Sequence, residues 1–135
     1  MDLLARREHS RPELERKLEA KSFANDVVAV VLDKLESDGL LSSERFARSF
    51  VDSRASRGHG PYRIRRELAD RGVSGDEYVN DSRHDWGRLA RDVRTRKFGP
   101  GAPANLREKA RQVRFLEYRG FGQDQIRKAL EFSDE

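Results

Sequence analysis

Apolar residues recur along this chain at every third or fourth position, in short groups separated by glycine, proline and polar residues. Such spacing places apolar side chains on one face of an α-helix. The valine-rich run 27–31 could form a strand, but the apolar positions that continue beyond it favour a buried helix: Val28, Val31, Leu32 and Leu35. The pattern therefore predicts an all-α protein with about eight or nine helices, each roughly 8–17 residues long.

Residues that favour helix ends indicate where these helices begin and stop. Ser10 predicts an N-cap, with Pro12 in the first turn and Glu13 completing a capping box. Further N-caps are expected at Asn25 or Asp26, at Ser42 or Ser43, and at Ser74. The segment 99–103, Gly-Pro-Gly-Ala-Pro, is the strongest break. The helix after it is expected to bury one face, with Leu106, Ala110, Val113 and Leu116.

One short pattern occurs three times: LEAKSF at 18–23, LADRGV at 68–73 and LEYRGF at 116–121. In each copy a leucine anchors the end of a helix, a basic residue complements the helix dipole, and an apolar residue follows a small one. Glycine suits the left-handed conformation that ends a helix, and Ser22 replaces it in the first copy. An aspartate after each copy is expected to cap the next helix: Asp26, Asp76 and Asp124.

Three small helical units of one kind predict a stacked array, because each is too small to bury its own apolar face. We place the units at residues 1–39, 40–82 and 83–135, with a shortened first helix at 1–8. Such arrays tend to be elongated and curved, and they suit a groove or a filament better than a small-molecule pocket. The alternative is a compact helical bundle in which the repeat is a relic of duplication.

Composition narrows the class of protein further. Only 36% of residues are hydrophobic and 39% are charged, which favours narrow apolar stripes over one large core. The absence of cysteine excludes disulfides, thiolate zinc sites and cysteine nucleophiles, and it fits a reducing compartment. The first residues are charged, and no run approaches the roughly 18 apolar residues of a membrane span. We therefore expect a cytoplasmic protein without membrane attachment.

Charge is distributed in blocks that the net charge of +4 conceals. Residues 43–73 hold 8 basic and 4 acidic residues (net +4), and residues 83–119 hold 11 and 4 (net +7). Residues 1–42 hold 7 and 9 (net −2). Most of the bases are arginine, whose planar guanidinium grips phosphate or carboxylate at two points. The blocks favour a surface that binds a polyanion or an acidic protein, although arginine also serves on solvated helix faces.

The bases of these blocks are the candidate binding residues. The first group surrounds one turn: Arg54, Arg57, Arg63, Arg65, Arg66 and Arg71. The second follows one helix: Arg88, Arg91, Arg94, Arg96 and Lys97. The third follows the next: Arg107, Lys109, Arg111 and Arg114. Because Ile64 and Leu68 should point inward, some arginines around them must reach solvent. Pairing with Glu67 and Asp70 is the structural alternative for the first group.

No constellation of residues indicates catalysis or a bound cofactor. His9, His59 and His84 are dispersed and lack metal-ligand spacing, so we expect no metal site. The turn 58–61, Gly-His-Gly-Pro, could present N–H groups to a phosphate, yet no Walker lysine-serine pair accompanies it. Turn geometry is the expected role of its glycines. We therefore expect neither an enzyme nor a cofactor.

The stretch 54–73 carries a specific pattern, Arg-x-x-Arg-Gly-x-Gly-Pro-x-x-Ile-x-x-Glu-Leu-x-x-Arg-Gly-Val. It resembles the signature of the RecX family, which are bacterial regulators of the RecA recombinase. Residues 4–14 resemble the first-repeat motif of that family, and residues 40–47 resemble the segment that opens its second repeat. The region of Asp85 and Trp86, together with Phe98, resembles the third repeat of that family. The resemblance covers nearly the whole chain.

Membership of that family implies three tandem three-helix repeats, similar to helix-turn-helix units, in an elongated and curved body. It also implies binding to the RecA–DNA filament, with contacts to single- or double-stranded DNA. Inhibition of recombination, ATP hydrolysis and co-protease activity would then modulate DNA repair and the SOS response. The expected protein is a monomer and not an enzyme. The alternative that the residues leave open is a stand-alone helix-turn-helix-like DNA-binding module.

Overall fold

The computed structural model describes residues 8–132. Within them the chain forms eight helices and no strand, which confirms the predicted all-α class. The shortened first helix expected at 1–8 falls outside the described residues except for Glu8. The helices are α2 (Arg11–Ala20), α3 (Asn25–Ser37), α4 (Ser43–Ser56), α5 (Pro61–Asp70), α6 (Asp76–Asp81), α7 (Trp86–Phe98), α8 (Leu106–Tyr118) and α9 (Gln123–Ala129).

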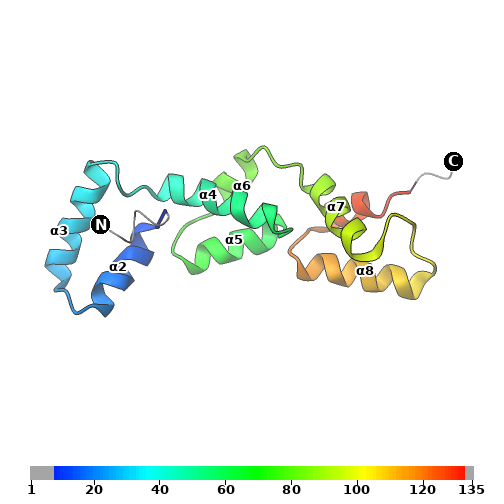
Figure 1. Ribbon diagram of the computed structural model, residues 1–135, viewed down its shortest axis with the longest axis horizontal. Helices are drawn as coiled ribbons and strands as arrows, with labels where there is room; N and C mark the ends of the chain where they lie inside the picture. Colours follow the sequence, from blue (N-terminus) through cyan, green and yellow to red (C-terminus); the bar gives the residue numbers. More distant parts are fainter. Residues whose placement is uncertain (1–7, 133–135) are drawn as a thin grey trace.

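Three groups of helices follow one another along the long axis: α2 and α3, then α4 to α6, then α7 to α9 (Figure 1). Each group has its own cluster of buried apolar side chains. The first contains Leu14, Leu18, Val28, Leu32, Leu35 and Leu41. The second contains Phe46, Ala47, Val51, Ile64, Leu68, Val73 and Val79. The third contains Ala90, Val93, Leu116, Phe121, Ile126 and Ala129. Three small cores in a row make an elongated molecule, so the compact-bundle alternative is wrong.

Backbone conformation at the helix ends confirms the repeat. Ser22, Gly72 and Gly120 have positive φ angles of 67°, 78° and 99°. The apolar residue after each donates its backbone N–H to the carbonyl of the leucine of the same copy, at 3.4, 3.0 and 3.1 Å in chain order. Ser22 therefore adopts a conformation that glycine would take with less strain.

Two of the predicted helix starts are confirmed. The hydroxyl of Ser10 accepts a hydrogen bond from the backbone N–H of Glu13 at 3.2 Å. The hydroxyl of Ser42 accepts one from the N–H of Arg45 at 3.1 Å. Each bond satisfies one N–H that has no partner inside its helix. Of the two serines considered for this second cap, Ser42 is the one that serves.

The predicted N-caps of α3 and α6 are wrong. Ala24 occupies this position before α3 and Gly75 before α6, and Gly122 does so before α9. The aspartates of the repeat lie one or two residues later, in the first turns of these helices: Asp26, Asp76 and Asp124. There the carboxylates lie at the positive end of the helix dipole, and that of Asp26 accepts a hydrogen bond from the N–H of Val27 at 3.0 Å.

The predicted inner face of α8 needs correction near the start of the helix. Leu106 is 83% exposed, because it is the first residue of α8 and projects beyond the third core. Ala110 is exposed as well, and the buried residues of α8 are Gln112 and Leu116. In α3 the inner face is Val28, Leu32 and Leu35, with Val31 half-buried.

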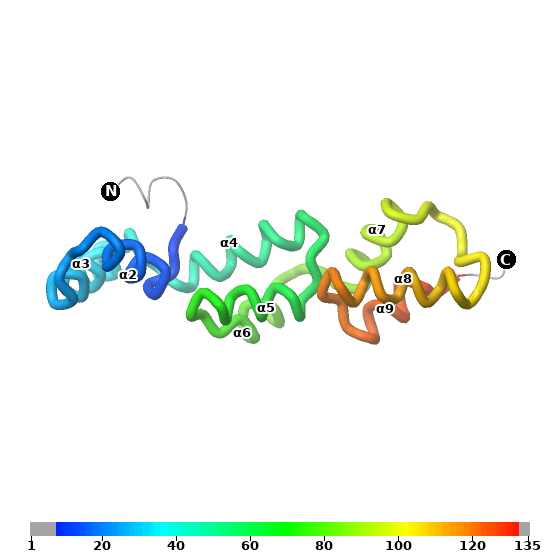
Figure 2. Tube along the Cα trace, turned by 90° about the horizontal axis from the view of Figure 1, so that it is seen from below, coloured from blue at the N-terminus to red at the C-terminus, as the bar shows by residue number. Residues whose placement is uncertain are grey.

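The second and third units join where α8 ends and α5 begins. The backbone N–H groups of Gly60 and Tyr62 donate to the carbonyls of Arg119 and Gly120, at 2.8 and 3.0 Å respectively. A Cβ atom on Gly60 would lie 2.4 Å from the carbonyl carbon of Gly120, so this junction requires glycine. Helices α5 and α8 consequently follow one another along the long axis (Figure 2).

The first and second units join in the same manner, where α5 ends and α2 begins. The hydroxyl of Ser10 donates to the carbonyl of Arg71 at 3.1 Å. A Cβ atom on Gly72 would lie 2.7 Å from the ring of Pro12. The guanidinium of Arg16 adds a hydrogen bond to the Asp70 carbonyl at 3.4 Å. Helices α8, α5 and α2 therefore meet end to end.

Candidate interaction surface

Three arginines of the central stretch converge on Glu67. Its carboxylate accepts hydrogen bonds from Arg54 Nε at 2.7 Å and from Arg63 Nε at 2.9 Å. Its backbone carbonyl accepts one from Arg71 Nη1 at 3.0 Å. The side chains of Arg54 and Glu67 are each only 18% exposed, so this ion pair is sheltered from solvent. The alternative of pairing with Glu67, which the sequence left open, therefore holds for Arg54 and Arg63.

Electrostatics at this cluster favour charged Glu67 and neutral His59. Burial opposes ionisation of the Glu67 carboxyl, but the hydrogen bonds from Arg54 and Arg63 outweigh burial and lower its pKa. Burial lowers the pKa of the His59 ring, and the positive charge of Arg63 lowers it further. The cluster therefore holds one negative charge between two positive ones at neutral pH.

The other arginines of this stretch divide into bound and unbound side chains. Arg65 Nη2 donates to Asn80 Oδ1 at 2.7 Å, and Arg65 Nε lies 3.3 Å from Asp76 Oδ1. Arg57 and Arg66 are exposed, and within residues 8–132 their side chains make no hydrogen bond or ion pair. Of the six arginines predicted to bind a partner, these two are fully available.

Arg94 does not belong to the predicted binding surface, because its side chain is buried. It is 1% exposed, and its Nε donates to Gln112 Oε1 at 2.8 Å. Its terminal nitrogens donate to the carbonyl of Gly99 at 3.2 Å and to that of Gly101. Burial lowers the pKa of Arg94, and the nearby charge of Arg91 lowers it further. Arg94 thus fixes the 99–101 loop against the end of α7 and cannot reach a partner.

A cluster of cations and aromatic rings lies where α7 and α8 pack together. The rings of Phe98 and Phe115 meet edge to face, with centroids 5.3 Å apart. Lys97 and Arg119 lie over Phe115 at 5.8 and 5.2 Å, and Arg111 lies over Phe98 at 5.4 Å. Such contacts hold the charged groups near the surface while their stems cover the rings.

Arg119 connects this cluster to the central stretch, although the sequence analysis did not select it. Its Nη1 donates to the carbonyl of Arg57 at 3.3 Å, across the junction of the second and third units. The signal was present, since Arg119 is the basic residue of the third copy of the repeat. The helix dipole alone explained a basic residue at that position, so the contact between Arg119 and Arg57 was not predicted.

The remaining candidates of the third unit are mostly exposed. Arg91 is exposed but donates to the carbonyls of Lys128 and Glu131, at 2.8 and 3.3 Å. Arg111 pairs with Glu108 at 2.8 Å. Six candidates are exposed with side chains that make no hydrogen bond or ion pair in the described part of the chain: Arg88, Arg96, Lys97, Arg107, Lys109 and Arg114. Most of the exposed candidate cations without a hydrogen bond or ion pair in the described residues therefore lie on α7 and α8, and fewer lie in the central stretch.

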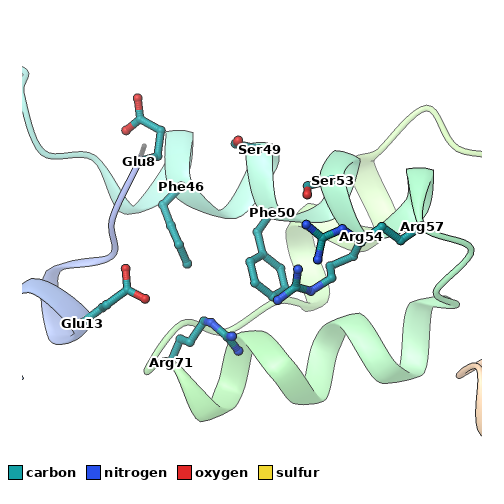
Figure 3. Close-up of a pocket in the computed structure, with 9 residues that line it drawn as sticks. All are labelled: Glu8, Glu13, Phe46, Ser49, Phe50, Ser53, Arg54, Arg57 and Arg71. Carbon is teal, nitrogen blue, oxygen red and sulfur yellow. The ribbon is translucent and has the colours of Figure 1, made fainter. Parts of the chain in front are cut away.

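A cleft lies between the first and second units, with a volume of about 350 Å³. Figure 3 shows Phe46 and Phe50 pointing from α4 toward α5, with Arg71 reaching toward Phe50 from the end of α5. The guanidiniums of Arg54 and Arg71 lie 4.4 and 4.8 Å from the Phe50 ring centroid. The cleft is lined by Glu8, Glu13, Phe46, Ser49, Phe50, Ser53, Arg54, Arg57 and Arg71.

No group of three or more histidine, aspartate or glutamate residues that could hold a metal ion occurs among residues 8–132. No helix in the same range is long and apolar enough to cross a bilayer. The turn 58–61 does not offer its N–H groups to a phosphate, since those of Gly58 and His59 donate to carbonyls of α4 and that of Gly60 donates to the Arg119 carbonyl at the end of α8. Its expected role in turn geometry thus includes the junction between units.

Comparison with known proteins identifies the family. The three three-helix domains of RecX match residues 1–35, 44–78 and 88–130 in order. The chain is 49% identical to regulatory protein RecX of Halorhodospira halophila (strain DSM 244 / SL1) over 136 residues, covering 98% of this chain and 84% of that protein. It is 46% identical to regulatory protein RecX of Pseudomonas fluorescens (strain Pf-5) over 133 residues, covering 96% and 86%.

A crystal structure of regulatory protein RecX has the same fold, with a TM-score of 0.74 at 20% sequence identity. The match covers 93% of this chain and 65% of the solved chain. Three matching domains in the same order, and relatives this similar over nearly the full length, decide the matter: the chain belongs to the RecX family of regulatory proteins.

Proposed function

We propose that this protein binds the RecA–DNA filament as a cytoplasmic monomer and inhibits RecA without being an enzyme. The activities affected are recombination, ATP hydrolysis and co-protease function, and through them DNA repair and the SOS response. The observation that carries the proposal is the elongated row of three units of a RecX protein, with exposed cations on α7 and α8 that have no ion pair within residues 8–132. Such a body can follow a helical groove over a long distance, which a compact domain cannot.

The physical role of the cations is to supply affinity for the phosphates of the filament DNA. Each phosphate neutralised by lysine or arginine releases a counterion, so this affinity falls as the salt concentration rises. The helical body supplies shape, and its bulk in the groove blocks subunit addition or the active conformation of RecA. Neither role requires a catalytic group or a cofactor.

The test is the ATPase activity of RecA on single-stranded DNA, measured with increasing amounts of this protein. Inhibition at stoichiometric protein is expected. Unchanged ATPase activity at that ratio would contradict the proposal. A pull-down against RecA with and without DNA then establishes whether the filament or free RecA is preferred.

A stand-alone DNA-binding module is the second candidate, and the unpaired arginines of α7 and α8 are the observation in its favour. It predicts selective binding to particular duplex sequences, because base contacts in the grooves provide specificity. Filter binding with random and selected duplexes separates the two candidates. Equal, weak and salt-sensitive binding to all duplexes favours the filament regulator.

A further inference from the structure

We propose that the cleft between the first two units receives a protein segment in which an acidic side chain adjoins an apolar one. Under the function proposed above, on which this inference rests, the segment belongs to the surface of RecA. The cleft would then be the site that contacts protein, while the cations of α7 and α8 contact DNA.

One end of the cleft is built to receive a single carboxylate. Ser49, Ser53 and Arg57 are spaced four residues apart on α4, which places them on one face of the helix. Arg57 makes no ion pair through its side chain within residues 8–132, and Arg71 binds a carbonyl oxygen but no carboxylate there. Arg57, beside Ser53, can therefore offer a carboxylate charge-assisted hydrogen bonds, whereas Arg71 lies on the other side of Phe50 (Figure 3).

The middle of the cleft is aromatic. The rings of Phe46 and Phe50 lie 5.7 Å apart and are tilted by 39°. Phe46 belongs to the second core and is 3% exposed, whereas Phe50 is only partly buried. Figure 3 shows both rings pointing away from α4 into the space before α5. An apolar side chain placed there would contact Phe50 while its acidic neighbour reaches Arg57.

The opposite wall argues against a nucleic acid as the occupant. Glu8 and Glu13 line the same cleft, on the side of the first unit (Figure 3). Glu8 Oε1 lies 2.9 Å from Arg45 Nε and pairs with it. A phosphate chain that passed through the cleft would approach these carboxylates, and like charges repel. A protein segment can instead limit its negative charge to one side chain. The volume of about 350 Å³ also suits one or two side chains.

The test uses the full chain and two charge changes inside the cleft. Ser53→Glu places a carboxylate one turn before Arg57, where it can pair with Arg57 and occupy the anion site. Arg57→Glu removes the guanidinium and repels an incoming acid. The matched control is Arg107→Glu, an equal charge reversal at an exposed residue of α8 without an ion pair in the described residues. Binding to immobilised RecA with a non-hydrolysable ATP analogue and no DNA is measured for each variant, and binding to labelled poly(dT) is measured in parallel.

The expected result is at least about tenfold weaker binding to RecA for both cleft variants, as is typical when an interfacial charge pair loses a partner. The control should change RecA binding less than about twofold and should weaken poly(dT) binding instead. Cleft variants that keep the RecA affinity of the control would overturn the inference. Wild-type protein that fails to bind RecA would overturn the proposed function itself. Thermal melts confirm that each variant is folded.

Discussion

The carbonyl oxygen of Arg119 accepts a hydrogen bond of 2.8 Å from the backbone N–H of Gly60, which ties the last turn of α8 to the first turn of α5. The bond joins two units that otherwise have separate cores. It also uses an N–H that a helix start leaves without an internal partner. Stability of the whole array therefore depends on a contact between backbones, where no side chain can be repacked.

Gly60→Ala is expected to destabilise the protein by about 2 kcal/mol or more, because overpacking here presses a methyl group against backbone. The added Cβ would lie 2.4 Å from the carbonyl carbon of Gly120. The control is Gly101→Ala, where nothing lies within 4 Å of the added atom. Urea denaturation of both variants measures the difference, and equal midpoints would show that the junction tolerates a side chain.

Ser22→Gly is expected to stabilise the protein by about 1 kcal/mol. The left-handed conformation raises the free energy of a residue that has a Cβ by about this amount, and glycine avoids the strain. The φ angle of Ser22 is 67°. Ala20→Gly, two residues earlier and inside α2, should do the opposite and cost about 1 kcal/mol. Chemical denaturation of the two glycine variants checks the pair, and a shift of the same sign in both would refute the explanation.

Glu67→Gln is expected to cost about 1–3 kcal/mol at pH 7, between the values for exposed and buried ion pairs. Its pKa in the folded protein is lowered from the ordinary 4.5. The stabilisation is therefore complete above that ordinary value and is lost as the pH falls through the folded pKa. Denaturation of wild type and variant at pH 7 and at low pH should show the difference shrinking with acid. The control is Glu117→Gln, which removes an exposed carboxylate of α8 without an ion pair among residues 8–132 and should change stability at pH 7 by less than about 0.5 kcal/mol.

The substitutions Arg94→Gln and Arg114→Gln are expected to change different properties: the first lowers folding stability and the second weakens DNA binding. The first leaves two loop carbonyls and Gln112 without their donor, and should cost about 2 kcal/mol of stability or more. The second removes an exposed charge and should leave stability within about 0.5 kcal/mol of wild type. Arg114→Gln should instead weaken poly(dT) binding and lower its salt slope by about 1. A stable Arg94→Gln protein with weakened poly(dT) binding would contradict this assignment and show that Arg94 contacts DNA.

Local signals in the sequence predicted the helices well. Ser10, Gly72 and Gly120 act within a few residues of where they stand, so cap and turn chemistry suffices to place them. The failed N-caps at Asp26 and Ser74 were also local, but there a neighbour without a capping side chain took the position. Helix starts can shift by one residue at little cost when first-turn carboxylates already favour the helix.

The availability of each arginine could not be predicted from the sequence. Arg54 meets Glu67 across a turn, 13 residues away, and Arg94 meets Gln112 across the 99–105 segment, 18 residues away. Which cations are paired depends on how helices pack, and periodicity does not report that. Charge blocks show where basic residues are concentrated along the chain, and the structure shows which members of each block remain exposed.

The end-to-end arrangement of α8, α5 and α2 gives the molecule an electrical polarity along its length. The carbonyl end of α8 meets the N–H end of α5, so these two helix dipoles point the same way along the long axis, and the carbonyl end of α5 meets the start of the inclined helix α2 (Figure 1). The positive pole lies at the start of α8, in the segment 83–119 with net charge +7. The negative pole lies at the end of α2, in the segment 1–42 with net charge −2. Near a polyanion this charge distribution is expected to orient the molecule so that its third unit makes the first contact.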